Sequence, residues 1–409
     1  MRKKWRLFHA TDFQSLMLPC FTLCRMLGIF PYKISGSSFE ASKSRYILSS
    51  IALGVFCFFF IGNFYELHIT KKIQLNGVPD TLQTDCFCTV GGFITIVTYI
   101  LSGQRMRLLQ TVMKVSSTLP PKTYDRLSRI LHAKDIIGFV FLFGQIVNCR
   151  DVRIINAMSK MFSLYILLLI FQMDMLYMNC VCVLKACFRK INDNLLNLRK
   201  LAINNESHRF MHVYRERENS FLLVKLRMLQ KWHLMISDTV QMLNVIFSPQ
   251  LLATVVMTFT EITFHLYFYA IQLRIVQKMP IVNLDKQIWY SHMSTAIVYY
   301  SIKLALIVWS CETGKNEALK IGTTVHDVLV SIKDKQLKDE LQLFSLQILH
   351  RNNTFSAKGL TVDAKFITAI VGSITTYLLI LVQFMNAANN CDGKWSGNAT
   401  QIFEVKNDN

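Results

Sequence analysis

Seven long apolar runs, separated by segments rich in basic residues, constrain the fold of this chain more than any other feature. A helix needs about 20 predominantly apolar residues to cross the hydrocarbon core of a bilayer. The runs cover residues 46–65, 85–103, 136–148, 161–184, 245–269, 289–309 and 364–386. The third is short and, taken alone, resembles a buried or re-entrant segment. Because 52% of the residues are hydrophobic and only 17% are charged, the sequence predicts an all-α membrane protein with seven transmembrane helices.

The basic residues predict the orientation of these spans. With the N-terminus in the cytoplasm, 33 of the 45 Lys and Arg residues fall in cytoplasmic segments and 10 fall outside. Leaving out the third span removes most of this bias, so the positive-inside rule favours seven spans. We therefore expect residues 1–45 to be a cytoplasmic N-terminal segment and residues 387–409 to be an extracellular tail. We expect no cleavable signal peptide, and the first span would direct its own insertion.

Helical stripes continue from the spans into the cytoplasmic segments. Apolar residues recur every three or four positions within residues 185–244 and again within residues 310–363. This spacing places them on one face of a helix. We therefore predict that spans four and five continue as helices into the cytoplasm and pack together, and that residues 310–363 form a cytoplasmic helical anchor segment. A docking groove for a partner helix is the alternative.

The cysteines and the missing motifs narrow the function. Cys86, Cys88 and Cys149 lie near the predicted outer side of the membrane. There Cys149 could form a disulfide with Cys86 or Cys88, and free thiols are the alternative. The sequence has no C-x-x-C pair, no phosphate-binding loop and no H-E-x-x-H or G-x-S-x-G motif. We expect no enzyme activity, no metal and no cofactor, and the basic charge is explained by topology without a nucleic-acid partner.

The last span contains an unusual polar pattern, Thr376-Tyr377, five apolar residues and then Gln383-Phe384. This pattern resembles the signature of the insect gustatory receptors. The segment before that span, from Glu340 to Leu360, is also similar to that family. The resemblance is strong over about the last 80 residues; elsewhere it rests on the number of spans, their orientation and the loop lengths.

The resemblance implies a ligand-gated, non-selective cation channel. Four subunits, as a homotetramer or a heteromer with related receptors, would surround one pore lined by residues 364–386. Residues 46–309 would hold an outward-facing ligand pocket. The partners would be a small-molecule tastant (a sugar, an amino acid or a bitter compound), permeating cations and membrane lipid. The protein would be located in the plasma membrane of chemosensory neurons. The subfamily stays open between a broad or bitter-type branch and a fructose-type branch.

Polar side chains in the last span are candidates for the pore. A neutral amide costs less at membrane depth than a charge, and its carbonyl oxygen can replace water around a cation. We predict that Gln383 and Thr376 line the pore and that Phe384 forms an apolar gate beside them. Hydrogen bonding between helices is the alternative for Gln383, and we favour such a structural role for Tyr377.

Ionisable and aromatic residues near the outer ends of three spans are candidates for the ligand pocket. Glu261 and His265 stand one helical turn apart, and ionisable groups inside a span are suspected of function. The full set is Glu261, His265, Tyr269, Trp289, His292 and Tyr165. The alternatives are an aromatic belt at the membrane interface and a simple hydrogen bond between His265 and Glu261.

Two other functional classes compete with the channel. A metabotropic seven-helix chemoreceptor would signal through partner proteins, but G-protein-coupled receptors have the opposite orientation, and their Asp-Arg-Tyr and Asn-Pro-x-x-Tyr motifs are missing here. A transporter is a third hypothesis, although the sequence shows none of the inverted repeats that are typical of secondary transporters.

Overall fold

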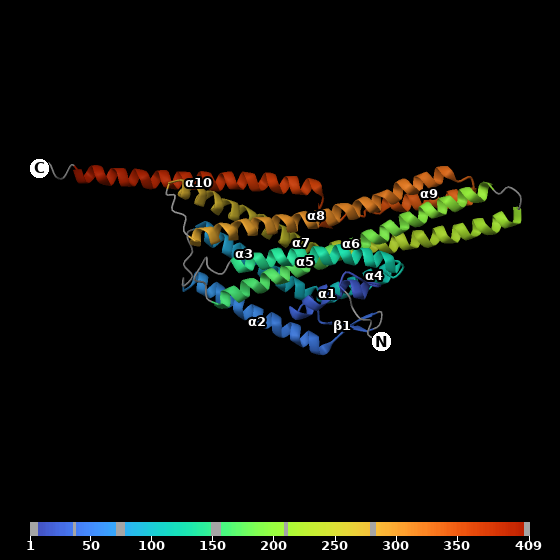
Figure 1. The fold of residues 1–409 in the computed structure, drawn as a ribbon, viewed down its shortest axis with the longest axis horizontal. Helices are drawn as coiled ribbons and strands as arrows, with labels where there is room; N and C mark the ends of the chain where they lie inside the picture. The colour runs from blue at the N-terminus through green and yellow to red at the C-terminus, as the bar shows by residue number, and fades with distance from the viewer. Residues whose placement is uncertain are drawn as a thin grey trace.

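The computed structural model describes residues 7–35, 38–70, 78–148, 157–207, 212–278 and 284–404. These residues form long helices, as expected for an all-α fold, together with two short antiparallel hairpins (Figure 1). The elements are α1 (Phe13–Met26), β1 (Tyr32–Ser35), β2 (Ser38–Ala41), α2 (Lys43–His68), α3 (Val78–Ile100), α4 (Ser102–Ser116), α5 (Pro121–Asn148), α6 (Ala157–Ser207), α7 (His212–Lys278), α8 (Leu284–Ser331), α9 (Lys335–His350), β3 (Ser356–Ala357), β4 (Leu360–Thr361) and α10 (Ala364–Glu404).

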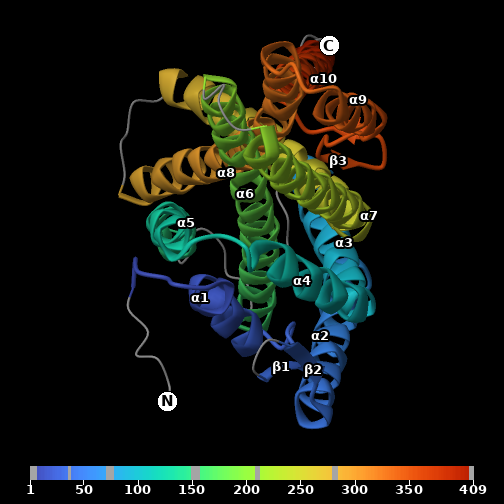
Figure 2. The ribbon, with the colours of Figure 1, turned by 90° about the vertical axis from the view of Figure 1, so that its right-hand side faces the viewer.

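Helix α6 is the centre of the bundle, with α1, α3, α4, α5, α7 and α8 arranged around it (Figure 2). The most apolar part of α6 is 89% buried, whereas the corresponding parts of α2 and α10 are 11% and 17% buried. A helix that is apolar on all sides belongs in an interior, and α6 meets this condition. Helices α2 and α10 instead expose most of their apolar side chains at the periphery.

Five of the described helices are long and apolar enough to cross a membrane: α2, α6, α7, α8 and α10. Helices α3 and α4, which meet at a bend of 65°, together make a sixth candidate. The predicted third span, residues 136–148, forms the second half of α5. The first half of α5 is rich in charged residues, so α5 is not one of the described helices that are apolar enough to count as a candidate span. The count of seven and the orientation stay predictions.

Helices α6, α7 and α8 continue past the other helices and form one end of the molecule together with α9 (Figure 1). The apolar stripes in these extensions are buried, which confirms the predicted packing. Buried stripe residues include Leu195, Leu198, Leu226, Ile236, Val240, Leu243, Leu337, Leu341 and Phe344. These stripe positions are therefore covered within the chain itself.

Polar contacts fix α9 against α7 in this region. Arg227 Nε lies 2.6 Å from Glu340 Oε1, and Arg351 Nη1 lies 2.9 Å from Asp238 Oδ1. Gln347 Nε2 donates to the carbonyl oxygen of Gln230 at 3.1 Å. These contacts join segments about 110 residues apart in the chain.

The N-terminal segment packs into the bundle. An Asp12 capping box begins α1, with Ser15 N donating to Asp12 Oδ1 at 2.8 Å. Gln172 Nε2 of α6 then donates to the carbonyl oxygen of Cys20 at 3.1 Å. On α5, His132 Nε2 lies 3.0 Å from the carbonyl oxygen of Leu16. Helix α1 is thus held between α5 and α6, which the sequence did not predict.

His233 makes the anchor region sensitive to acid. Its imidazole is fully buried between Phe188 and Phe344, and its Nδ1 lies 3.1 Å from Gln347 Nε2. Burial first, and then the charge of Arg351, lower the pKa of His233 to about 4. The unfolded chain takes up this proton below about pH 6.5, and the folded chain does so only near pH 4. The contribution of neutral His233 to the free energy of unfolding is therefore complete above about pH 6.5, and it is lost as the pH falls towards 4.

We predict that acidification from pH 7 to pH 5 lowers the thermal stability of the purified protein and that His233→Leu reduces this loss. The contribution of His233 between its two pKa values is on the order of 3 kcal/mol. Unfolding temperature in detergent as a function of pH measures the effect. His326→Leu, at an exposed position on α8, is the matched control. Equal pH dependence in wild type and His233→Leu would contradict the assignment.

Candidate functional site

A polar cluster joins α3 and α7 near one end of the bundle. Gln83 Nε2 on α3 donates to Glu261 Oε2 on α7 at 2.9 Å. One turn later on α7, His265 Nδ1 lies 2.6 Å from the carbonyl oxygen of Glu261 and 3.4 Å from its Oε2. The carbonyl oxygen only accepts, so Nδ1 carries the proton. Glu261 and His265 are both about 95% buried, so their polar groups must find partners within the protein.

Helix α8 completes the cluster with aromatic rings. The centroid of His265 lies 6.1 Å from that of His292 and 6.3 Å from that of Tyr300. Near the same end of the helices, Tyr269 makes an edge-to-face contact with Tyr290 at 5.6 Å. The structure therefore brings the predicted residues Glu261, His265 and His292 together. The side chain of Trp289, also predicted here, lies outside the described residues.

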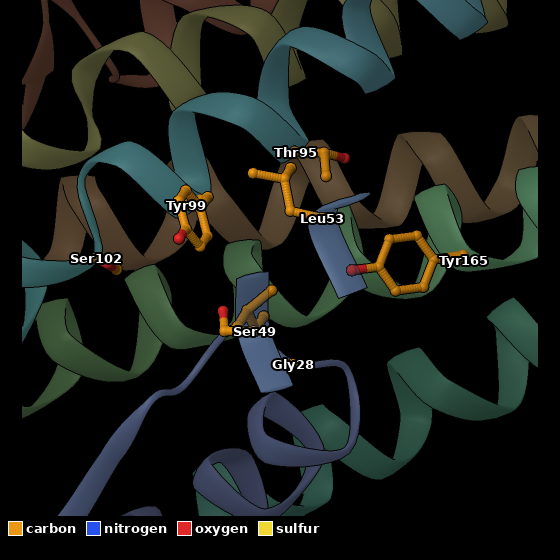
Figure 3. Close-up of a pocket in the computed structure, with 8 residues that line it drawn as sticks. Gly28, Ser49, Leu53, Thr95, Tyr99, Ser102 and Tyr165 are labelled. Atoms are coloured by element: carbon orange, nitrogen blue, oxygen red, sulfur yellow. The ribbon is translucent and has the colours of Figure 1, made fainter. Parts of the chain in front are cut away.

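Tyr165 lies elsewhere. Its hydroxyl group donates to the carbonyl oxygen of Leu27 at 3.1 Å, and its ring is 5.8 Å from that of Phe56. Figure 3 shows Tyr165 on α6 beside another pocket, which is bordered by α2, α3 and the turn after α1. The sequence placed Tyr165 with Glu261 because both stand near predicted outer ends, but α6 presents this side chain to α2 and the N-terminal segment.

A buried ion pair lies further along the same helices. Lys303 Nζ on α8 is 3.4 Å from Asp174 Oδ2 on α6, and the two side chains are 2% and 1% exposed. Thr254 Oγ1 on α7 donates to Asp174 Oδ1 at 3.1 Å. The Lys303 ammonium group also lies 5.3 Å from the ring centroid of Tyr300. Tyr300 thus contacts both this ion pair and His265.

The signature residues of α10 lie on its exposed surface. Gln383 is exposed, and Phe384 is 72% exposed. Thr376 Oγ1 donates to the carbonyl oxygen of Gly372 at 3.0 Å within the helix. Tyr377 makes an edge-to-face contact with Phe259 of α7 at 5.7 Å. This contact packs α10 on α7, whereas a hydrogen-bonding role for the Tyr377 hydroxyl group stays a prediction.

The described cysteines and acidic groups offer no covalent or metal site. Cys86 and Cys88 are free thiols, and Cys149 lies outside the described residues. No group of three or more His, Cys, Asp or Glu side chains within the described ranges could hold a metal ion. The proposed disulfide to Cys149 therefore stays untested.

Sequence reasoning missed Gln83 and Tyr300. Gln83 stands two residues before the second predicted span and 178 residues before Glu261, and no local pattern links two residues so far apart. Tyr300 offered a signal, because it stands two turns after His292 and three residues before Lys303 on the same helix.

The chain resembles known chemosensory proteins along most of its length. The sequence model of the 7tm chemosensory receptor family matches residues 17–386. Gustatory receptor 28b of Drosophila melanogaster is 30% identical over 166 residues, which are 40% of this chain and 35% of that protein. The Drosophila gustatory receptor for bitter taste 66a is 27% identical over 186 residues, 45% of this chain and 34% of that protein. The matched regions span only about a third of these relatives.

The fold is similar to that of a solved insect receptor. The olfactory receptor OR5 of Machilis hrabei has a TM-score of 0.67 over 90% of this chain and 98% of its own, at 10% sequence identity. The same receptor solved in complex with eugenol has a TM-score of 0.64. At this identity the likeness shows a shared fold.

We predict that Lys303→Met destabilises the protein and that adding Asp174→Asn restores most of the loss. A buried carboxylate without its partner costs about 3–5 kcal/mol, whereas removal of both charges costs much less. The midpoint of thermal aggregation in detergent measures the effect. Lys320→Met, on the exposed face of α8, is the control. A double variant as unstable as Lys303→Met would show that the two charges do not depend on one another.

Proposed function

Because the chain belongs to the 7tm chemosensory receptor family, we propose that it is a gustatory receptor that acts as a ligand-gated, non-selective cation channel. Its family is one of multi-pass membrane receptors and not of enzymes. In this proposal a small-molecule tastant binds between the spans, and cations pass along α10 of four assembled copies in the plasma membrane of chemosensory neurons.

The exposed face of α10 is the observation that carries the proposal. Thr376, Gln383 and Phe384 all lie on surface that the rest of this chain leaves uncovered. Large apolar side chains such as Leu379 and Phe384 are 58% and 72% exposed. Lipid tails can cover the apolar residues but offer no partner to an amide. A ring of copies would give Gln383 a hydrated pore and would pack Phe384 against its equivalents.

The cluster at Glu261 supports a ligand site for a small polar molecule. Its carboxylate, imidazole and phenol groups could accept hydrogen bonds from hydroxyl or amino groups and pack against their carbon atoms. Sugars, amino acids and alkaloids all present such groups. The eugenol complex of OR5 from Machilis hrabei supports small-molecule binding in a receptor with this fold.

The contacts of Tyr300 offer a route from the ligand cluster to the rest of the bundle. A ligand that displaces His265 would also press on Tyr300, which lies against Lys303. Lys303 in turn holds α8 to α6 through Asp174. A shift of α8 relative to α6 would then reach α10, which packs on α7 and α8.

The proposal is tested by current recordings in excised outside-out patches from cells that express the full chain. A panel of sugars, amino acids and alkaloids is applied without cytosolic signalling components. We expect a fast cation current with at least one compound. Silence in patches, together with a ligand response in the intact cells, would contradict the channel and support a metabotropic receptor.

An active ligand allows a test of the polar cluster. We predict that Glu261→Gln raises the half-activating concentration about tenfold or more, because a hydrogen bond to a charged group is lost. Asp85→Asn is the matched control, since that carboxylate pairs with His68, 2.9 Å away, instead of joining the cluster. Equal shifts of the half-activating concentration in both variants would show that Glu261 is not part of the ligand site.

The same current allows a test of the pore. We predict that Gln383→Glu increases calcium permeability relative to sodium and that Gln383→Lys reduces cation current, since each places a ring of charge in the proposed pore. Reversal potentials under bi-ionic conditions measure the change, with surface expression as the control. Unchanged selectivity in variants that open normally would place Gln383 outside the pore.

A further inference from the structure

One histidine of α5 holds the N-terminal part of the described chain in place. His132 stands in the first half of α5 and is 3% exposed. The N–H group of Phe8 lies 3.2 Å from His132 Nδ1, and His132 Nε2 lies 3.0 Å from the carbonyl oxygen of Leu16. A single imidazole therefore joins two points, one before α1 and one in its first turn, to the same place on α5.

These two backbone partners fix the protonation state of His132. A carbonyl oxygen only accepts a hydrogen bond, so Nε2 must carry a proton. A backbone N–H group only donates, so Nδ1 must present its lone pair to Phe8. The observed arrangement is thus possible only for a neutral imidazole. A protonated ring carries N–H groups on both nitrogens, and its Nδ1–H would point at the N–H group of Phe8.

The backbone of Phe8 depends on contacts of this kind. Phe8 has a φ of 62°, in the left-handed region that residues with large side chains adopt only at a cost. Such a conformation persists where surrounding contacts hold it. The ring of Phe8 also lies 6.0 Å from that of His132. Loss of the bond to Nδ1 would remove one of the contacts that hold this backbone in place.

A second histidine, next to Phe8, responds to acid in the opposite sense. His9 Nδ1 lies 2.5 Å from Asp125 Oδ1, and protonation of His9 turns this contact into an ion pair. The side chain of His9 is 59% exposed, and exposed ion pairs contribute little to stability. We therefore expect the buried contact of His132 to decide how the segment responds to acid.

The other ionisable groups around His132 pair with groups of their own. Those within about two helical turns of its contacts are His9, Asp12, Cys20, Asp125, Arg126, Arg129, Lys134 and Asp135. Asp125 also pairs with Arg129 at 2.9 Å, and Asp135 pairs with Lys134 at 2.5 Å. From α6, Asn179 Nδ2 donates to Asp135 at 3.3 Å. The acceptor that Phe8 requires therefore comes from the neutral imidazole itself.

We propose that His132 is an acid-sensitive latch that releases the segment before α1 from α5. The latch is closed while the imidazole is neutral. When Nδ1 takes up a proton, the bond to Phe8 is lost and residues 7–11 leave α5, whereas α1 stays attached to α6 through Gln172 and Cys20. The bond is complete at neutral pH and is lost as the pH falls. With the predicted orientation the protons come from the cytoplasm. The latch does not depend on channel activity.

Hydrogen exchange of the full chain in detergent, followed by mass spectrometry, tests the latch. The readout is the exchange rate of peptides that contain residues 8–12, divided by the intrinsic rate at each pH. An ordinary imidazole titrates near about pH 6.5, so about pH 7.5 is compared with about pH 5.5. We expect exchange to become about tenfold faster in acid, as for the loss of one hydrogen bond. Peptides from the buried part of α6 are the internal reference and should not change.

Two substitutions of His132 separate the hydrogen-bond acceptor from the titration. His132→Asn places an amide oxygen close to the position of Nδ1, so it can accept from Phe8 without titrating. His132→Gln places its amide close to the position of Nε2, so it keeps a donor for Leu16 and offers Phe8 no acceptor. We expect slow exchange at both pH values for His132→Asn and fast exchange at both for His132→Gln.

Two further variants assign the response to His132. His9→Asn removes the other imidazole of the segment, and His233→Leu removes the buried histidine of the anchor region; both should keep the acid response. The wild-type comparison and these two variants leave His132 intact, so they decide the question even where a substitution at this buried position unfolds the chain. Equal exchange of the wild type at the two pH values would overturn the latch. An acid response that disappears in His9→Asn, or that persists in His132→Asn, would overturn it as well.

Discussion

The burial of α6 is the constraint on which the rest of the structure depends. Its apolar part is almost entirely covered, so every neighbouring helix is positioned by the face of α6 that it packs against. Asp174 adds a polar requirement to that interior, because its charge must be met by Lys303 of α8 and Thr254 of α7. This burial leaves α2 and α10 at the periphery with most of their apolar surface uncovered.

The peripheral helices α2 and α10 are the ones that leave the most apolar surface uncovered. The exposed face of α10 carries both polar and apolar signature residues, which suits a shared pore better than a lipid-facing surface. Helix α2 instead exposes apolar residues along most of its length. At the anchor end α6 to α9 pack together (Figure 1), and α6, α7 and α8 run from there into the rest of the bundle.

Local spacing predicted much of the fold and part of the site. The apolar runs predicted the long helices, and the stripes in residues 185–244 predicted the buried packing of the anchor. Family membership followed from a nine-residue pattern, and the match over residues 17–386 confirms it. Glu261 and His265 were found because a spacing of four residues brings side chains together within one helix.

Contacts between distant segments could not be read in the same way. The bond from Gln83 to Glu261 joins residues 178 positions apart, and the bond from Gln172 to Cys20 joins residues 152 apart. Tyr165 was placed in the wrong neighbourhood for the same reason, since the rotation of α6 about its axis depends on tertiary packing. The pairing of Asp174 with Lys303 likewise depends on how α6 and α8 pack side by side.

The central claim is that the exposed face of α10 meets its equivalents in neighbouring copies, and cysteine crosslinking at Phe384 tests it most directly. Phe384→Cys is expressed in cells, the membranes are oxidised mildly, and the chains are separated without reducing agent. The account predicts a covalent dimer for Phe384→Cys that is lost for Val371→Cys, an exposed position five residues before the signature motif, and for the wild-type chain. Monomers alone at position 384, in protein that reaches the cell surface, would contradict the shared pore.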